Sequence, residues 1–479
     1  MAEKMLQFVR LQQRQPDKRD ASERRADWGE VYQAFAADAA SQQASRCSQC
    51  GVPFCQVHCP LNNNIPDWLK LTAEGRLEEA YEVAAGTNTF PEICGRVCPQ
   101  DRLCEGNCVI EKGFDSVTIG AVEKYITDTA WEKGWIKPPM PVRERQQSVG
   151  IVGAGPAGMA AAERLRTMGY QVTIYDRHDR AGGLMIYGIP NFKLEKDIVV
   201  RRWKQYVMGG IQFRLNTTIG RDVTLGELRQ RHDALLVATG VYKARDIDNA
   251  GAGLPGVVAA LDYLIASNRK GLGDDVPDFE SGALNAEGKH VVVVGGGDTA
   301  MDCVRTAVRQ GAASVTCLYR RDKANMPGSM REVKNAEEEG VRFEWLAAPE
   351  AFFGEGKVEG VRAQRMHLGL PDATGRQQVE PIAGAHFNLR ADLVIKALGF
   401  DPEDLPAAFG EPELTVTRWG TLKIDYRTMM TALPGVFAAG DIVRGASLVV
   451  WGIRDGRDVA EQIHQFIQAR GAAPAMAAE

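Results

Sequence analysis

The chain has 479 residues, of which 44% are apolar, 25% charged and 7% aromatic. This balance is ordinary for a globular protein of about three domains at roughly 150 residues each, and it excludes a disordered chain, a collagen-like fibre and a coiled coil. The net charge of −5 provides no basic field for nucleic acid. No apolar run approaches the ~18 residues of a membrane span, and the N-terminus lacks the apolar stretch of a secretion signal. We therefore expect a cytoplasmic protein that binds neither nucleic acid nor membrane.

Residues 1 to about 45 are polar and carry both positive and negative side chains in similar number. Two interpretations remain open for this segment. It is either a solvated helix and loop or a contact surface for another subunit.

Eight of the ten cysteines lie between Cys47 and Cys108. Thiols concentrated in one segment, without a secretion signal, are typical of metal binding and not of a disulfide framework. Eight thiolates can hold two 4Fe–4S clusters, and two zinc sites of four thiolates each are the alternative. The first set, CxxCxxxxCxxxCP, and the second, CxxxCPxxxxCxxxC, comprise Cys47, Cys50, Cys55 and Cys59, and Cys94, Cys98, Cys104 and Cys108.

The spacers between these cysteines have helical character. Residues 66–88 show helical apolar spacing that is interrupted at Gly75, and no strand is recognisable nearby. The Pro-rich run 135–145 is typical of a linker. We expect an all-α domain that ends at this linker.

From Ser148 the pattern changes to strand, glycine turn, helix and strand. Gly153, Gly155 and Gly158 form GxGxxG directly after the apolar strand VGIV. The first glycine permits a tight turn, the second lets a pyrophosphate approach the backbone, and the third lets the helix pack closely on the strand. Gly169 suits the end of the helix, and Asp176 ends the second strand, where a carboxylate can accept from a ribose hydroxyl pair. This unit predicts dinucleotide binding.

A second unit of the same kind begins at His290. Gly295, Gly297 and Ala300 give GxGxxA after a strand, and Tyr319 followed by Arg320 and Arg321 occupies the place of the acid. A guanidinium binds a 2′-phosphate that a carboxylate would repel. The unit therefore predicts NADPH selectivity; a solvated arginine pair at a strand end is the alternative.

Two such units in one chain resemble the flavoproteins with two dinucleotide-binding domains, which include glutathione and thioredoxin reductases. The resemblance implies FAD in the first unit, NADPH in the second, and the NADPH domain inserted into the FAD domain. It makes GVFAAGD (435–441) the second FAD motif, with Gly440 and Asp441 at the ribityl and pyrophosphate, and places the next helix N-terminus near the flavin ring. Disulfide reductases of this family need a cysteine pair beside the flavin. Cys303 and Cys317 have no close-spaced partner, so we expect buried core thiols and another exit for the electrons.

The cysteine segment supplies that exit. NADPH delivers two electrons as a hydride, clusters accept one at a time, and flavin converts between the two. Hydride transfer requires positioning but no acid or base, so no catalytic residue is assigned.

Taken together, the double cysteine motif, VGIVGAGPAG, AGGLMIYGIPNFKL, VVVVGGGDTAMDC, YRRDKANMPGS and GVFAAGDIVRGASLVVWGIRDGR closely resemble the small (β) subunits of bacterial NADPH-dependent glutamate synthases. That family implies electron transfer from NADPH to FAD, then through iron–sulfur clusters to FMN on a large (α) subunit, which makes L-glutamate from glutamine and 2-oxoglutarate. By resemblance to dihydropyrimidine dehydrogenase, one cluster is bound by Cys47, Cys50, Cys55 and Cys108 and the other by Cys59, Cys94, Cys98 and Cys104. A hetero-oligomer with the large subunit is expected.

The expected fold is α/β: an N-terminal all-α iron–sulfur domain followed by two Rossmann-like domains, the FAD domain being interrupted by the NADPH domain. The expected boundaries are 1–145 for the iron–sulfur domain and linker, 146–254 and 405–479 for the FAD domain, and 255–404 for the NADPH domain. The candidate cofactor-binding residues are Gly153, Gly155, Pro156, Ala157, Gly158, Asp176, Gly182, Gly183, Leu184, Tyr187, Gly188, Ile189, Pro190, Gly240, Gly295, Gly297, Asp298, Thr299, Ala300, Arg320, Arg321, Gly440 and Asp441.

Two competing functions remain. The same module also supplies electrons in dihydropyrimidine reduction and ferredoxin:NADP transhydrogenation, so another NADPH–flavin electron-entry subunit is the first alternative. A regulatory protein that uses zinc and a nucleotide as ligands is the second.

Overall fold

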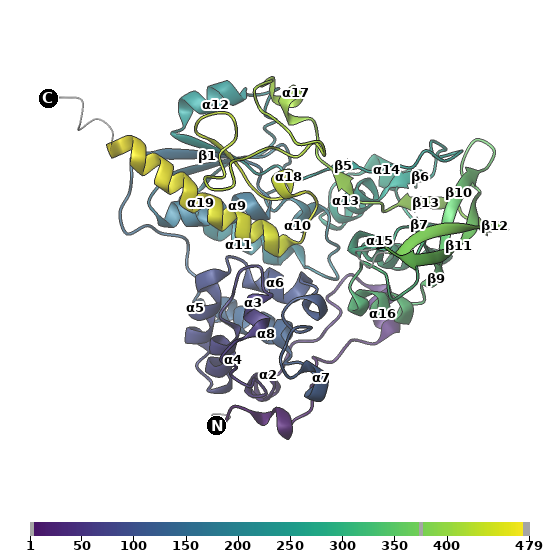
Figure 1. Ribbon diagram of the computed structural model, residues 1–479, viewed down its shortest axis with the longest axis horizontal. Helices are drawn as coiled ribbons and strands as arrows, with labels where there is room; N and C mark the ends of the chain where they lie inside the picture. Colours follow the sequence, from purple (N-terminus) through teal and green to yellow (C-terminus); the bar gives the residue numbers. More distant parts are fainter. Residues whose placement is uncertain (1–3, 373–376, 473–479) are drawn as a thin grey trace.

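The computed structural model describes residues 4–372 and 377–472. The chain forms a helical part, two parallel sheets with helices packed on them, and a projecting antiparallel ribbon (Figure 1). Every named element before residue 148 is a helix, as expected. These helices are η1 (Gln7–Val9), α1 (Ala21–Ala26), α2 (Ala37–Ser45), α3 (Phe54–Val57), α4 (Ile65–Ala73), α5 (Leu77–Thr87), α6 (Pro91–Val97), η2 (Gln100–Arg102), α7 (Glu111–Phe114) and α8 (Ile119–Glu132).

The helical part has its own apolar core. Trp68 and Leu69 of α4 are buried with Ile126 of α8 and with the cysteines Cys47 and Cys55. Gly75 separates α4 from α5 with a φ of +78°, which a residue with a side chain rarely adopts. The cysteines are therefore carried on short helices and loops around a fixed core.

The first parallel sheet has the strand order β15-β4-β1-β2-β3. Ile151 of β1 pairs with Ile174 of β2 on one side and with Leu236 of β4 on the other. The strands are almost continuously apolar because helices cover both faces of the sheet. Its strands are β1 (Ser148–Val152), β2 (Gln171–Tyr175), β3 (Gln212–Arg214), β4 (Ala234–Val237) and β15 (Val436–Ala438), and its helices are α9 (Pro156–Thr167), α10 (Leu184–Tyr187), α11 (Lys196–Met208), α12 (Leu225–Arg231), α17 (Leu405–Phe409), α18 (Asp441–Arg444) and α19 (Val449–Ala472).

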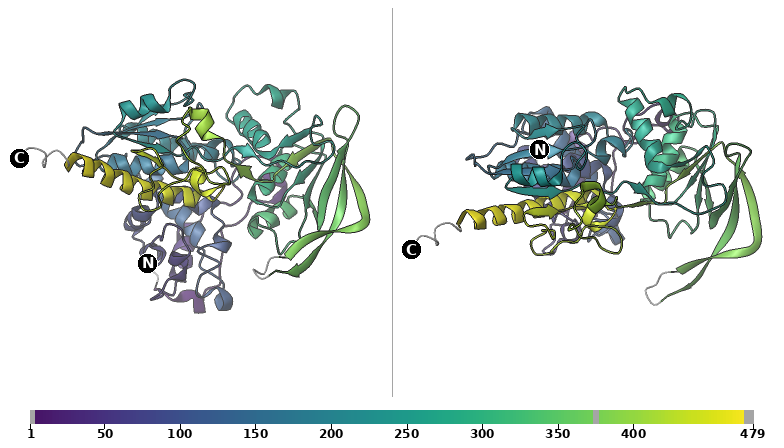
Figure 2. Two further views of the ribbon diagram at one scale, coloured as in Figure 1. Left: turned by 45° about the horizontal axis from the view of Figure 1, so that its top comes forward. Right: turned by 90° about the horizontal axis from the view of Figure 1, so that it is seen from above.

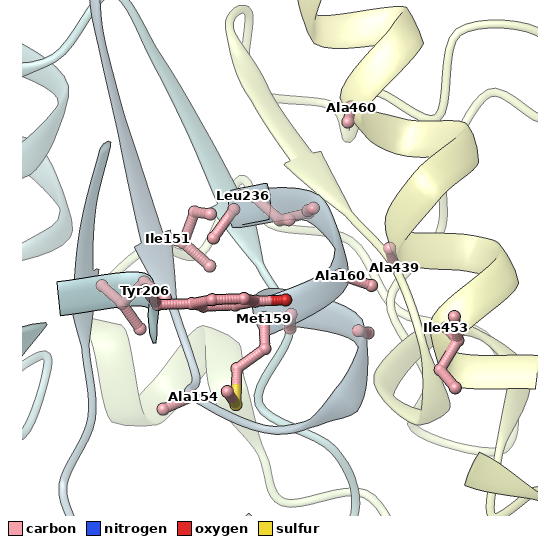
Figure 3. Packing of buried hydrophobic residues seen from close by; sticks show 14 of the residues in the cluster. Ile151, Ala154, Met159, Ala160, Tyr206, Leu236, Ala439, Ile453 and Ala460 are labelled. Atoms are coloured by element: carbon pink, nitrogen blue, oxygen red, sulfur yellow. The ribbon is translucent and has the colours of Figure 1, made fainter. Parts of the chain in front are cut away.

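The core of this part joins segments that are far apart in the sequence (Figure 3). Ile151 and Leu236 of the sheet pack against Met159 and Ala160 of α9, and Ile453 of α19 covers the same cluster. Helix α19, which comes after the last strand, thus packs into the same core as β1, the first strand.

The second parallel sheet has the order β6-β13-β7-β8-β9, and all its strands lie between Val257 and Lys396. Two short antiparallel strands, β5 (Lys243–Ala244) and β14 (Phe400–Asp401), connect it with the first part. Its strands are β6 (Val257–Ala259), β7 (His290–Val294), β8 (Ser314–Tyr319), β9 (Arg342–Trp345) and β13 (Leu393–Lys396), and its helices are α13 (Ala260–Gly271), α14 (Pro277–Glu280), α15 (Asp298–Arg309) and α16 (Met330–Glu338). Cys303 and Cys317 are buried in this part, as predicted.

An antiparallel sheet of three strands, which we did not predict, is attached to the second part: β10 (Ala347–Phe353), β11 (Gly360–Pro371) and β12 (Gln377–Arg390). β10 pairs with β11 only as far as Arg365. Beyond that residue β11 and β12 continue as a ribbon that extends away from the molecule (Figure 2).

The N-terminal segment packs on its own chain, which neither of our two interpretations described. Arg24 of α1 is 2% exposed and donates to Glu338 of α16 at 2.9 Å, and Lys18 contacts the same carboxylate at 3.0 Å. Charged side chains of this segment therefore form ion pairs with α16, in the part of the molecule that contains the second sheet. The paired residues are more than 300 positions apart in the sequence.

Within residues 4–372 and 377–472, no helix combines the length and the apolar character that crossing a membrane requires.

Candidate functional site

The first glycine turn connects the end of β1 with the start of α9. A Cβ on Gly153, whose φ is +111°, would lie 2.3 Å from the carbonyl oxygen of Ala238, and a Cβ on Gly158 would lie 2.0 Å from the carbonyl oxygen of Gly153. Both glycines are thus required by the packing of the protein itself. Gly155 is different, because a Cβ there would meet nothing within 4 Å. The space beside it, at the N-terminus of α9, is open for an anionic ligand.

Asp176 follows β2 directly and lies beside this turn. Its carboxylate accepts hydrogen bonds from the backbone N–H groups of Ala154, at 2.7 Å, and His178, at 2.8 Å. A cavity of about 110 Å³, lined among others by Gly153, Asp176 and Thr239, opens at the same place. The structure therefore brings the predicted acid to the predicted turn.

Residues 182–190 form a wall beside the first glycine turn. The N–H of Gly182 donates to the carbonyl oxygen of Ala154 at 2.8 Å, and a Cβ on Gly183 would lie 2.8 Å from the Cα of Gly155. α10 follows, and its last residue, Tyr187, donates its hydroxyl to Asp179. The remaining candidates of this segment, Gly188, Ile189 and Pro190, come directly after α10.

Lys196, which we did not single out from the sequence, holds this wall in place. Its buried ammonium donates to the carbonyl oxygens of Met185, at 3.1 Å, and Ile189. Burial lowers the pKa of this group to about 7. A lysine in a helical stretch gives no sequence signal for such a role, because only the fold shows which carbonyl groups it meets.

Two later segments reach the first turn from β4 and β15, which are neighbours in the sheet. The hydroxyl of Thr239, next to Gly240, is buried and has no hydrogen-bond partner among the described residues. A Cβ on Gly440 would lie 2.9 Å from the Cβ of Ala157. Asp441 accepts from the hydroxyl of Ser447 at 2.6 Å, and burial raises its pKa to about 6.

The start of α19 packs on the start of α9. A Cβ on Gly456 would lie 2.2 Å from the carbonyl oxygen of Ala157, and a Cβ on Gly452 would lie 3.5 Å from the Cβ of Pro156. The N-terminal ends of two helices, each with the positive end of its dipole, therefore lie at the first glycine turn.

The second glycine turn repeats this geometry at the end of β7. Gly295 has a φ of +146°, and a Cβ there would lie 2.3 Å from the carbonyl oxygen of Ala397, whereas a Cβ on Gly297 would meet nothing within 4 Å. Asp298 begins α15 and accepts from the N–H of Ser329 at 2.9 Å. Thr299 and Ala300 complete the first helical turn.

The two arginines follow β8, as expected from the sequence. Arg320 is exposed. The Nε of Arg321 is buried and has no hydrogen-bond partner among the described residues, so the side chain retains a donor for a ligand.

The eight clustered cysteines separate into two groups of four. The thiols of Cys59, Cys94, Cys98 and Cys104, which we call the inner set, line one cavity of about 30 Å³ together with Val450 of α19. Burial raises the pKa of Cys59 to about 11, and the inner-set thiol of Cys94 adds to this effect.

The remaining four, Cys47, Cys50, Cys55 and Cys108, are called the outer set. Burial, followed by the thiols of Cys47 and Cys108, raises the pKa of Cys55 to about 12. The pKa of Cys47 is raised by burial, with Cys108 and Cys50 contributing. Cys108, the last cysteine of the second motif, thus lies with the first three cysteines of the first motif.

The residues present fit the predicted cofactors. Each glycine turn leaves an opening that a Cβ would fill, Thr239 and Arg321 offer unpaired buried polar atoms, and four thiols face one cavity. Within the described residues, no three His, Cys, Asp or Glu side chains are placed to hold a single metal ion.

Comparison with known proteins supports both halves of this description. The family described as dihydropyrimidine dehydrogenase domain II, 4Fe-4S cluster, matches residues 24–135, and the family described as pyridine nucleotide-disulphide oxidoreductase matches residues 147–465. FprA from Mycobacterium tuberculosis, as a His57Gln mutant, has a similar fold: the TM-score is 0.58 at 22% identity, over 68% of this chain and 86% of that one.

Several relatives match nearly the whole chain, and two of them show the range of their names. The putative oxidoreductase AegA of Escherichia coli (strain K12) is 46% identical over 460 residues, which are 95% of this chain and 69% of that longer protein. The glutamate synthase [NADPH] small chain of Azospirillum brasilense is 67% identical over 479 residues, which are 100% of this chain and 99% of that one. At this identity and coverage, this chain belongs to the family of glutamate synthase [NADPH] small chains.

Proposed function

We propose that this chain is the electron-input subunit of a glutamate synthase. It oxidises NADPH by hydride transfer to FAD and passes single electrons through two 4Fe–4S clusters to FMN on a large subunit, which forms L-glutamate from glutamine and 2-oxoglutarate. FAD is assigned to residues 146–254 and 405–479, NADPH to residues 255–404, and the clusters to residues 1–145. A cytoplasmic location and a hetero-oligomer with the large subunit are part of the proposal.

One observation carries this proposal: the candidate flavin site, the inner set and the outer set adjoin one another in the order that the electrons need. The first glycine turn contacts the start of α19, Val450 of α19 lines the inner-set cavity, and Cys55 of the outer set contributes to the raised pKa of Cys104 of the inner set. Electron tunnelling between redox centres requires that the centres lie close together. Sites that served separate purposes would not need to be adjacent.

The protein's contribution to the reaction is positioning. When bound, the flavin takes a hydride from NADPH and gives up electrons singly, and the clusters carry one electron each. Gly155 and Gly297 would leave the two pyrophosphates room against the helix N-termini, and Asp176 would accept a hydrogen bond from a ribose hydroxyl. The N-terminal ends of α9 and α19 favour negative charge on a ligand at the first turn. Lys196 keeps residues 184–190 in place beside it.

The decisive experiment uses the anaerobically purified complex. NADPH should bleach the flavin absorption, and metal analysis should find about eight iron atoms per chain, as two 4Fe–4S clusters require. A colourless protein that contains zinc would contradict the proposal and favour a regulatory role. A chain that bleaches normally but co-purifies with a ferredoxin-type partner would favour the other electron-entry function.

Ligation of the clusters is proposed to follow the inner and outer sets. Cys108→Ser should then disturb the same cluster as Cys50→Ser, as seen in the electron paramagnetic resonance (EPR) spectrum of the reduced protein. Cys104→Ser is the matched comparison, because it lies four residues from Cys108 and should disturb the other cluster. If Cys108→Ser and Cys104→Ser affect one and the same cluster, ligation follows the sequence order instead.

The large subunit is proposed to dock at the outer set. Four large apolar side chains within two residues of outer-set cysteines are exposed: Val52 (63%), Phe54 (48%), Val57 (57%) and Val109 (55%). Exposed apolar groups of this size are typical of an interface, and the last cluster of the path must approach its acceptor. Phe54→Ser should weaken association in sedimentation measurements at least tenfold, a size typical of an interface anchor. Leu370→Ser, in the distant ribbon, is the control and should have no effect.

A further inference from the structure

The stretch between the inner-set cysteines Cys98 and Cys104 contacts the loop that covers the second glycine turn. Asp101 accepts from the hydroxyl of Ser329 at 3.2 Å and from the N–H of Met330 at 3.3 Å. These contacts join segments 228 residues apart in the sequence. Figure 1 shows α16, which follows this loop, at the edge of its part nearest the helical part.

Arg331, the second residue of α16, makes two hydrogen bonds across this junction. Its guanidinium donates to the amide oxygen of Gln100 at 2.9 Å and to the carboxylate of Glu105 at 2.9 Å. Glu105 is buried, and its other oxygen accepts from the N–H of Gly120 at 2.9 Å. The guanidinium thus connects Gln100, two positions after Cys98, with Glu105, one position after Cys104. Its charge-assisted pair with Glu105 is among the stronger kinds of hydrogen bond in proteins.

Gln100 connects the same contact to the inner set itself. Its buried amide donates to the carbonyl oxygens of Cys94 and Gly95, both at 3.2 Å. The backbone carbonyl oxygen of Gln100 accepts from the N–H of Leu103 at 3.1 Å and from that of Glu105 at 2.9 Å. A shift of Arg331 would therefore move the backbone that carries three of the four inner-set thiols.

On the other side, the loop lies on the proposed NADPH site. The N–H of Gly328 donates to the carbonyl oxygen of Gly296 at 2.9 Å, and the N–H of Ser329 donates to Asp298. Arg102, from between the cysteines, reaches the same Asp298 at 3.6 Å. A dinucleotide pyrophosphate at Gly297 would lie directly against these groups. A cavity of about 670 Å³, lined among others by Gln100, Asp298 and Arg331, lies at this junction.

We propose that Arg331 and Asp101 are positioning residues that couple occupancy of the second dinucleotide site to the inner cluster. This inference rests on the proposed function, because it takes the second glycine turn as the NADPH site and the inner set as cluster ligands. Coupling between two sites is reciprocal, so an NADP⁺ affinity that depends on the redox state of the cluster implies a potential that depends on NADP⁺. A fivefold difference in affinity, at the low end of typical couplings, corresponds to about 40 mV for a one-electron centre.

The test measures the reduced clusters of the anaerobically purified full chain by EPR and by redox titration, with and without saturating NADP⁺. In the unmodified chain, NADP⁺ should change the signal of one cluster and shift its potential by about 40 mV or more. Arg331→Met and Asp101→Asn should abolish that shift. Arg331→Lys should restore it only in part, because an ammonium cannot bridge both acceptors as a guanidinium does. Lys334→Met, an exposed residue of the same helix, is the control and should keep the full shift.

The outcomes separate this inference from the function on which it rests. A cluster signal that NADP⁺ leaves unchanged, while a flavin-absorption titration shows that NADP⁺ binds, would overturn the inference alone. A full shift that persists in both Arg331→Met and Asp101→Asn would do the same, because it would be a through-space effect of the bound charge. A chain without any iron–sulfur signal would overturn the proposed function as well. Asp101→Asn keeps the size of the side chain, so it still decides the question if Arg331→Met fails to fold.

Discussion

The two dinucleotide units of this chain share a backbone geometry and differ in their chemistry. In each, the first glycine of the turn would collide at 2.3 Å with a carbonyl oxygen if it carried a Cβ, and the second glycine faces open space. The units diverge where the second strand ends. Asp176 is held by backbone N–H groups beside the first turn, whereas Arg320 and Arg321 follow the corresponding strand of the second unit.

This difference separates two kinds of glycine and two kinds of ligand. The first glycine of each turn serves the fold, and we propose that the second leaves room for a pyrophosphate. On this proposal, the residue after the second strand decides which dinucleotide is preferred, because a carboxylate accepts from ribose hydroxyls and a guanidinium binds a phosphate. One architecture can therefore be used twice in one chain for two cofactors.

The largest effect is expected at the first glycine. Gly153→Ala combines a left-handed φ with overlap onto backbone, so it should destabilise the first sheet by about 3–5 kcal/mol, measured as the free energy of unfolding in urea. Gly295→Ala should act in the same way on the second sheet. Equal stability of both variants and the unmodified chain would show that these turns are not required by packing.

The second glycines should separate the two cofactors. Gly155→Ala should leave unfolding within about 0.5 kcal/mol of the unmodified chain and weaken FAD retention about 10- to 100-fold. Gly297→Ala should retain FAD and weaken NADPH binding to a similar degree, as measured by flavin content and by NADPH titration. Loss of FAD from Gly297→Ala would contradict the assignment of one dinucleotide to each unit.

The arginine pair should determine the choice of coenzyme. Replacing Arg320 and Arg321 together by Ala should lower kcat/KM for NADPH about 100-fold, since each charge-assisted hydrogen bond contributes about 1.5–3 kcal/mol. The value for NADH should change little, because it has no 2′-phosphate. An equal loss with both coenzymes would show that these side chains do not recognise the 2′-phosphate.

The smallest effect is expected at the third position, where the units differ. Gly158 cannot carry a Cβ, which would lie 2.0 Å from a carbonyl oxygen, whereas Ala300 already has one in the corresponding place. Ala300→Gly should cost only about 1 kcal/mol in thermal unfolding, from lost helix propensity, and keep NADPH binding. A much larger loss would indicate that the methyl group contacts the cofactor.

Local patterns allowed much of this architecture to be predicted. The apolar strand followed by glycines and a helix identified both turns, and the spacing of eight thiols identified the cysteine sets. The projecting ribbon was missed, because its exposed strands lack the continuous apolar runs that signalled the parallel sheets. The packing of the N-terminal segment was missed as well, since its charges look solvated until Glu338 is brought to them by the fold.

The amino-acid sequence by itself determined the kinds of chemistry present: two glycine turns, an acid and an arginine pair at strand ends, and eight thiols, because each is a local pattern with a local physical cause. Only the tertiary structure decided which groups meet. It placed Lys196 against residues 184–190, Val450 beside the inner set, and Arg331 across the junction between two parts of the molecule. These contacts join residues distant in the chain, and long-range contacts follow from packing, not from any pattern that a short stretch can carry.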